Sequence, residues 1–284
     1  MGWWHRLVGG GEASNARARR PAALAASLAD APREGLDWLG RRPSAEAPRL
    51  YRVLLRLGEV FLYRVCAIRI RVEGREASPR GGYILVVALH RSWIDPRVVL
   101  RALPVEPRVW FMGSGPTAFD RPWKERLLRR TGGILPVWRG GVGIDVHVEA
   151  ARAVVEEGAV LALFIEGRIA GPPDRPARAR DGAALLALRT DAPIVLMALC
   201  GSEVLYRGKR ISARLLPPTS VSELIGPRDG TDAVPGTRAE LRLAHALTTA
   251  MTERIAAAVT LDHPGTVDPP DHPRRWPWLS RLMR

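Results

Sequence analysis

The sequence contains very little cysteine and very little lysine. Its two cysteines, Cys66 and Cys200, stand far apart and in no C-x-x-C pair. This argues against a disulfide scaffold and a zinc ribbon, and it favours a reducing cytoplasm. Lysine occurs only at positions 124 and 209, so arginine supplies nearly all of the 43 basic residues. Against 29 acidic residues this leaves a net charge of +14, which predicts an anionic partner such as phospholipid headgroups, a phosphorylated substrate or a nucleic acid.

Long uninterrupted apolar runs are also missing. The best candidate, residues 50–72, is broken by five arginines and a glutamate, whereas a membrane span needs about 20 mostly apolar residues. The first residues, Met1 to Arg6, are followed by glycines rather than by the apolar stretch of a signal peptide. We therefore expect any contact with a membrane to be peripheral.

The 284 residues, 46% of them hydrophobic, suit one large α/β domain with appendages. We expect a loosely structured segment over 1–45, the folded domain over 46–265 and a basic, tryptophan-containing tail over 266–284. From about residue 67 to 216, apolar β-rich runs alternate with helical patterns, which predicts a mixed, mainly parallel sheet sandwiched by helices. Residues 211–215 are expected to add an edge strand, and residues 237–259 a long C-terminal helix.

Residues 46–66 are predicted to form an N-terminal amphipathic helix. Leu50, Leu54, Leu57, Phe61 and Val65 recur at helical spacing, with Arg52, Arg56 and Glu59 on another face. A helix packed on the core and a helix lying in a membrane interface both fit this pattern. We favour packing on the core, because the arginines are not confined to one stripe.

A histidine and an aspartate five positions apart follow a hydrophobic strand. The predicted strand over 83–89 runs into His90, and Asp95 precedes Pro96, where a helix is expected to begin with Asp95 as its N-cap. Sites in open α/β sheets lie at the carboxyl ends of strands. A carboxylate on one imidazole nitrogen would fix the tautomer and leave the other nitrogen as a base. The alternative is that Asp95 only caps its helix and His90 is an ordinary turn residue.

Two further predicted strands end in arginine-containing turns. The apolar strand over 159–165 is followed by Glu166, Gly167 and Arg168, and the strand over 134–137 is followed by Arg139. Glycine lets a backbone approach a ligand closely, and arginine binds phosphate in a bidentate fork. The simpler interpretation is a solvated ion pair in the first turn and a surface arginine in the second.

In this order, these segments resemble the motifs of the lysophospholipid (glycerophosphate) acyltransferase family over roughly residues 65–215. The family has four blocks: a His and an Asp separated by four residues, a glycine–strand–arginine block with proline, a Phe-Pro-Glu-Gly block continued by Thr-Arg or Arg-Ile, and a proline-led apolar strand. The matching residues are His90 and Asp95; Gly133, Pro136 and Arg139; Phe164 to Ile169; and Ala192 to Met197. The sequence departs from the family at Leu89, Ile165 and Leu196, where asparagine, proline and proline are usual.

The resemblance implies an α/β sandwich that transfers an acyl group directly from a thioester. His90 would take the proton of the acceptor hydroxyl, and Asp95 would hold the imidazole in the right tautomer. Arg139, Glu166, Gly167 and Arg168 would organise the phosphate end of the acceptor, with Glu166 orienting an arginine or binding a hydroxyl. No G-x-S-x-G turn surrounds Ser92, so no acyl-enzyme is expected. No metal or bound cofactor is implied; acyl-CoA or acyl-carrier protein is a co-substrate.

The acceptor expected from the resemblance is 1-acyl-glycerol-3-phosphate, which would give phosphatidic acid; another lysolipid, a glycolipid or a polyol remains an alternative. A nucleic-acid-binding protein would fit the charge, but no DNA- or RNA-binding motif is present. We expect the enzyme on the cytoplasmic face of the membrane, docked through Trp3, Trp4, Trp276 and Trp278 and the arginines beside them. The alternative is that these tryptophans pack on the domain.

Overall fold

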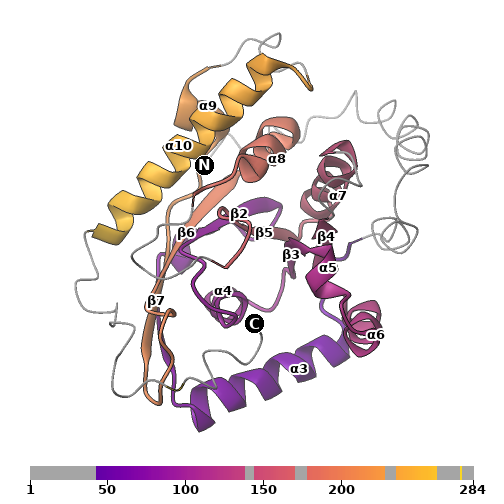
Figure 1. Ribbon diagram of the computed structural model, residues 1–284, viewed down its shortest axis with the longest axis vertical. Helices are drawn as coiled ribbons and strands as arrows, with labels where there is room; N and C mark the ends of the chain where they lie inside the picture. The colour runs from indigo at the N-terminus through magenta and orange to yellow at the C-terminus, as the bar shows by residue number, and fades with distance from the viewer. Residues whose placement is uncertain (1–42, 138–143, 170–177, 228–234, 261–275, 277–284) are drawn as a thin grey trace.

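The computed structural model describes residues 43–137, 144–169, 178–227, 235–260 and Trp276. Within these ranges the chain forms a seven-stranded sheet in the order β1-β7-β6-β2-β5-β3-β4 (Figure 1). The only antiparallel neighbours in this described sheet are β6 and β7, so the expected mixed, mainly parallel α/β sheet is confirmed. The strands are β1 (Arg69–Glu73), β2 (Tyr83–Ala88), β3 (Val109–Ser114), β4 (Ile134–Val137), β5 (Val160–Phe164), β6 (Ile194–Cys200) and β7 (Arg210–Leu215).

Helices cover both faces of the sheet (Figure 1). On one face, α7 (Ile144–Glu156), α8 (Gly182–Thr190) and α10 (Arg238–Thr260) pack on alternate residues of β2, β5 and β6. On the other face, α4 (Asp95–Ala102) packs on the remaining residues of the same strands. Strands buried on both faces are nearly continuous apolar runs, which is why the sequence of β2, YILVVA, made this strand recognisable. The remaining helical elements described are η3 (Arg75–Ala77), α5 (Gly115–Ala118), α6 (Pro122–Thr131) and α9 (Val221–Ile225).

Strand β7 is not at the edge of the sheet, contrary to expectation. It lies between β6, to which it is antiparallel, and β1, to which it is parallel. The edge position belongs to β1, which precedes β2 in the chain but is separated from it by two strands. Strand order depends on long crossover connections, and the local sequence of residues 211–215 carries no information about them.

The expected N-terminal helix forms as α3 (Arg49–Glu59) and continues as one π-helical stretch, η2 (Val60–Val65). Its apolar side chains do not pack on the core: no residue of α3 is buried, and only Leu62 of η2 is. Val53 and Val60 are each 53% exposed and Leu57 is 61% exposed. The interpretation of this helix as a core-packed element is therefore wrong for α3. Helical periodicity identified the apolar side, but not what that side faces.

The ends of the chain fall largely outside the described residues, including nearly all of the expected segments 1–45 and 266–284 and, with them, Trp3, Trp4 and Trp278. Trp276 is described, and it packs against the apolar cluster beneath α4. Its backbone N–H donates to the Leu205 carbonyl at 2.8 Å. For Trp276 the alternative of packing on the domain is the one observed. Among the helices in the described ranges, none has the length and apolar character to cross a membrane.

Candidate active site

The carboxyl ends of β2 and β5 bring the first and third sequence motifs together. The two strands are parallel neighbours, and Val87 pairs with Phe164. The chain leaves β2 through Leu89, whose φ of +70° lies in the left-handed region. That conformation costs roughly 1–2 kcal/mol for a residue with a side chain. The backbone N–H of Leu89 donates to Glu166 Oε1 at 2.7 Å, so a carboxylate delivered by β5 holds the turn that precedes His90.

His90 and Asp95 form a hydrogen-bonded pair. His90 Nδ1 lies 2.9 Å from Asp95 Oδ2, and the Asp95 side chain is fully buried while that of His90 is 12% exposed. The same oxygen accepts hydrogen bonds from the backbone N–H groups of Arg91 and Ser92, at 2.7 and 2.8 Å. With Nδ1 engaged by a fixed carboxylate, Nε2 is left as the basic nitrogen. This is the arrangement required of a general base.

Asp95 does not cap its helix, which corrects one sequence expectation. Helix α4 begins at Asp95, its N-cap residue is Ile94, and no side chain caps its amides. The carboxylate instead points back to the loop at 90–92. The interpretation in which Asp95 serves only its helix and His90 only a turn is thereby excluded.

Phe164 packs against one face of the His90 imidazole. Its ring stacks on His90 with the centroids 3.8 Å apart and the planes 14° apart, and Phe111 of β3 lies 6.4 Å further along, nearly parallel. The ring of His90 is thus held by a carboxylate at one edge and an aromatic plane on one side. In the sequence, Phe164 stands out only as part of a motif. The parallel register of β2 and β5 is the signal that places it beside His90, and that register is not visible in the sequence.

Glu166 is 5% exposed, and its contact with Leu89 was not anticipated. Gly167 follows with φ +65°, and Arg168 is exposed at the tip of the turn. Within the part of the chain that the structure describes, no ion pair joins Glu166 to Arg168, and Glu166 Oε2 has no hydrogen-bond partner. Arg139, the remaining predicted site residue, lies outside the described residues, although β4, the strand before it, is parallel to β3.

Cys200 is the last residue of β6, the strand that neighbours β2 on the side opposite to β5. Burial, with a contribution from Glu203, raises its pKa to about 11. The thiol is therefore protonated at neutral pH and is a poor nucleophile. Across the described ranges, no group of three or more His, Cys, Asp or Glu side chains is arranged to hold a metal ion.

The His90–Asp95 pair thus lies at the carboxyl end of a parallel strand with the geometry that a general base requires. Residues 69–199 match the sequence model of the family described as Acyltransferase. This domain of the chain belongs to the acyltransferase family, as its motifs imply. Among solved structures, the chain is similar to PlsC, the 1-acyl-sn-glycerophosphate (LPA) acyltransferase of Thermotoga maritima, with 17% sequence identity and a TM-score of 0.46. The match covers 75% of this chain and 82% of that one.

The Leu89–Glu166 contact leads to a testable expectation. Glu166→Ala removes the acceptor that holds the left-handed turn, a conformation worth about 1–3 kcal/mol of strain, so we expect kcat to fall roughly 10- to 100-fold. Glu166→Gln keeps an oxygen that can accept from Leu89 and should retain most of the activity. Steady-state kinetics of both variants provide the measurement. Equal losses in both would show that the charge of Glu166, rather than its contact with Leu89, matters.

Proposed function

We propose that this protein transfers a fatty acyl group from acyl-CoA or acyl-carrier protein to the free hydroxyl of 1-acyl-glycerol-3-phosphate, giving phosphatidic acid. The observation that carries the proposal is the His90–Asp95 pair at the end of β2, in a domain of the acyltransferase family. Neither a metal nor a bound cofactor has a part in this reaction.

In the proposed reaction, His90 Nε2 accepts the proton of the acceptor hydroxyl as its oxygen attacks the thioester carbonyl. The imidazolium that forms is stabilised by the Asp95 carboxylate, which accepts the Nδ1 proton. The tetrahedral intermediate collapses by breaking the carbon–sulfur bond, and the departing thiolate receives the proton from Nε2. The products are an ester and a thiol, and no covalent bond to the protein forms.

The phosphate end of the acceptor would lie at the turn after β5. Arg168 is exposed there, carries no ion pair among the described residues and follows Gly167, whose φ of +65° lies in the left-handed region. A guanidinium can bind the phosphate through two parallel hydrogen bonds. We assign Arg139 to the same phosphate from the sequence motif. The buried Glu166 Oε2, unpartnered in the described part of the chain, is available to accept from a hydroxyl of the acceptor.

An assay of acyl transfer tests this assignment. Arg168→Ala should raise the KM for 1-acyl-glycerol-3-phosphate about tenfold or more, because hydrogen bonds between charged groups contribute roughly 1.5–3 kcal/mol. The kcat should stay unchanged, since the phosphate is bound equally in the ground and transition states. The KM for the thioester should also stay unchanged, because Arg168 is assigned to the phosphate of the acceptor and not to the thioester. Arg242→Ala, at an exposed arginine of α10, is the matched control. Transfer to an unphosphorylated acceptor at the wild-type rate would refute the proposed acceptor.

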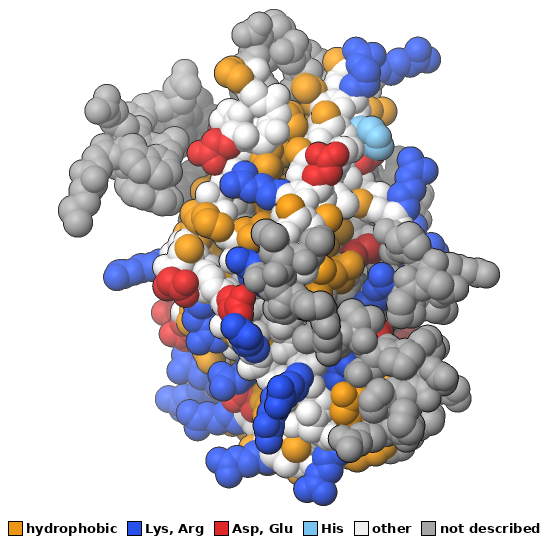
Figure 2. Space-filling view, turned by 90° about the vertical axis from the view of Figure 1, so that its left-hand side faces the viewer, with side chains coloured by type: hydrophobic (Ala, Val, Ile, Leu, Met, Phe, Trp, Pro, Cys, Tyr) orange, Lys and Arg blue, Asp and Glu red, His pale blue; other side chains and the backbone are white. Residues whose placement is uncertain are grey.

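The proposed substrate places the enzyme at a membrane, and we propose that it docks on the cytoplasmic face through α3 and η2. Their outward side carries an exposed apolar row: Leu50, Val53, Leu57, Val60, Phe61 and Val65. Exposed arginines flank this row at positions 49, 52, 56 and 64. Figure 2 shows basic side chains gathered over the lower half of the adjacent face, where β1 and β7 lie in Figure 1. An apolar row bordered by cations suits the boundary between headgroups and acyl chains of an anionic leaflet.

Vesicle co-sedimentation tests the docking surface. Leu57→Gln should lower the affinity for anionic vesicles about tenfold, since burying a leucine contributes roughly 1.5–3 kcal/mol. Leu241→Gln on α10 is the matched control, because Leu241 is 53% exposed but lies on the opposite face of the sheet. If both substitutions weaken binding equally, the apolar row of α3 is not the docking surface.

A further inference from the structure

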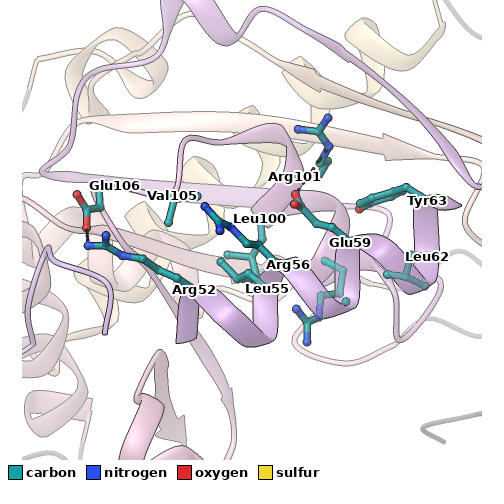
Figure 3. A pocket seen from close by; sticks show the side chains of 12 residues that line it. Arg52, Leu55, Arg56, Glu59, Leu62, Tyr63, Leu100, Arg101, Val105 and Glu106 are labelled. Atoms are coloured by element: carbon teal, nitrogen blue, oxygen red, sulfur yellow. Dashed lines mark hydrogen bonds and ion pairs between the residues drawn. The ribbon is translucent and has the colours of Figure 1, made fainter. Parts of the chain in front are cut away.

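Beneath the outward-facing row, α3 and η2 enclose a cavity with α4. Its volume is about 350 Å³, and it continues to the loop after α4 at Val105 and Glu106 (Figure 3). Arg52, Arg56 and Glu59 of α3 line this cavity and are also exposed, so the cavity is open to solvent. The apolar row lies on the other side of the helix. The charged lining residues are Arg52, Arg56, Arg97, Arg101, Glu59 and Glu106.

The charges in the cavity do not balance. Arg52 forms an ion pair and a hydrogen bond with Glu106, and Arg101 lies 3.9 Å from Glu59. These two pairs use both carboxylates of the lining. Arg56 and Arg97 have no acidic partner within the described ranges. Two guanidinium groups are therefore left to face a cavity of ligand size.

Position 58 of α3 makes room for one of these arginines. A Cβ placed on Gly58 would lie 2.9 Å from Arg97 Nη1 and 3.2 Å from its Cζ. A glycine inside a helix costs roughly 0.5–1 kcal/mol relative to alanine, and here it lets the half-buried guanidinium of Arg97 lie against the backbone of α3. Arg97 is the third residue of α4, two positions after Asp95.

The rest of the lining is apolar or uncharged. Leu55, Leu100 and Val105 form apolar walls. Tyr63 also lines the cavity, and burial raises the pKa of its phenol to about 12, so the phenol stays neutral and can donate a hydrogen bond. Unpaired guanidinium groups, a neutral donor and apolar walls together suit an amphiphile with an anionic head. A small inorganic anion would leave the apolar walls unused.

We propose that the cavity between α3 and α4 binds an anionic phospholipid by its phosphate group, with Arg97 and Arg56 contacting the phosphate and Leu55, Leu100 and Val105 contacting the start of its acyl chains. This lipid is a ligand of the docking helix and is separate from the acceptor, which reacts at His90. The inference rests on the proposed function only in assuming that the enzyme works at a phospholipid surface.

The test uses dioctanoyl phosphatidic acid as a soluble probe and isothermal titration calorimetry on the full chain. Arg97→Gln should weaken the binding at one site by about tenfold to a hundredfold, the range expected for a lost hydrogen-bonded charge. Arg242→Gln removes the same charge from an exposed position of α10, outside the cavity and away from the docking row, and should bind as the wild type does. Dioctanoyl phosphatidylcholine and inorganic phosphate complete the panel as competitors.

A second variant separates ligand binding from stability. Gly58→Ala adds a methyl group where the guanidinium of Arg97 lies and raises helix propensity. We expect weaker binding of phosphatidic acid with an unchanged or higher Tm, a combination that a purely structural role for Gly58 does not produce. Arg97→Lys keeps the charge without the planar fork and should bind with intermediate affinity.

The outcomes are decisive. Wild-type affinity in Arg97→Gln or Gly58→Ala would overturn the inference, and inorganic phosphate displacing the lipid at equal affinity would show a free-phosphate site instead. Failure of the proposed function looks different: no lysolipid would be acylated, while the binding that depends on Arg97 would persist.

Discussion

Replacing His90 with alanine is expected to lower kcat by about 10²–10⁴-fold, the usual contribution of a general base. Thermal stability should change little, because only one of the three hydrogen bonds to Asp95 Oδ2 is lost. The bond from His90 Nδ1 disappears, while those from the backbone N–H groups of Arg91 and Ser92 remain. Steady-state transfer assays and thermal denaturation of the same preparation give both quantities.

Ser92→Ala is the control for this prediction. Ser92 is buried beside the pair and contacts Asp95 through its backbone N–H, which alanine retains. We expect the rate of this variant to stay within a few-fold of the wild type. A near-normal rate in a folded His90→Ala variant, or loss of activity in Ser92→Ala with an acyl group trapped on the wild-type serine, would contradict the proposed chemistry.

Asp95→Asn is expected to be nearly as severe for turnover, with a loss of about 10²–10⁴-fold. The amide oxygen of asparagine can take the place of Oδ2 and accept from Arg91 and Ser92, so the loop should keep its shape. What is lost is the negative charge that stabilises the imidazolium of His90. We expect kcat to fall while the KM for the thioester and the Tm stay close to the wild-type values.

Asp95→Ala provides the contrast. It removes the acceptor of three hydrogen bonds from a fully buried position, and each unpaired buried donor costs roughly 1–3 kcal/mol. The Tm should therefore fall in this variant and not in Asp95→Asn. Retained activity in Asp95→Asn would mean that the carboxylate only shapes the loop.

Much of the fold follows from local pattern. The buried strands β2, β5 and β6 are uninterrupted apolar runs. The helix predicted over 237–259 is found at Arg238–Thr260, and the helix expected at Asp95 begins there. The helix predicted over 46–66 begins three residues later than expected, at Arg49. The pairing of His90 with Asp95 was also predictable, because five residues and a helix start bring the carboxylate back to the ring.

Two features, one in the candidate active site and one in α3, could not be predicted from local sequence because they depend on tertiary contacts. The contact between Glu166 and Leu89 joins residues 77 positions apart, and it depends on which strands are neighbours. The direction of the apolar side of α3 depends on which element packs against the helix. Here the side of α3 that carries Arg52 and Arg56 faces α4 across the cavity. Hydrophobic periodicity identifies the apolar side of a helix, but it does not tell whether that side packs on the domain or faces outward.

Adjacent amides at the end of β2 should exchange with solvent by two different routes. All six residues of β2 are buried, and the strand pairs with β5 on one side and β6 on the other. Its amide protons can exchange only when the whole sheet opens. The amide proton of Leu89, one residue further along, is held by the side chain of Glu166 instead of by a strand. Deuterium uptake at Leu89 therefore measures the opening of the loop that carries His90, while uptake at Ala88 measures the unfolding of the domain.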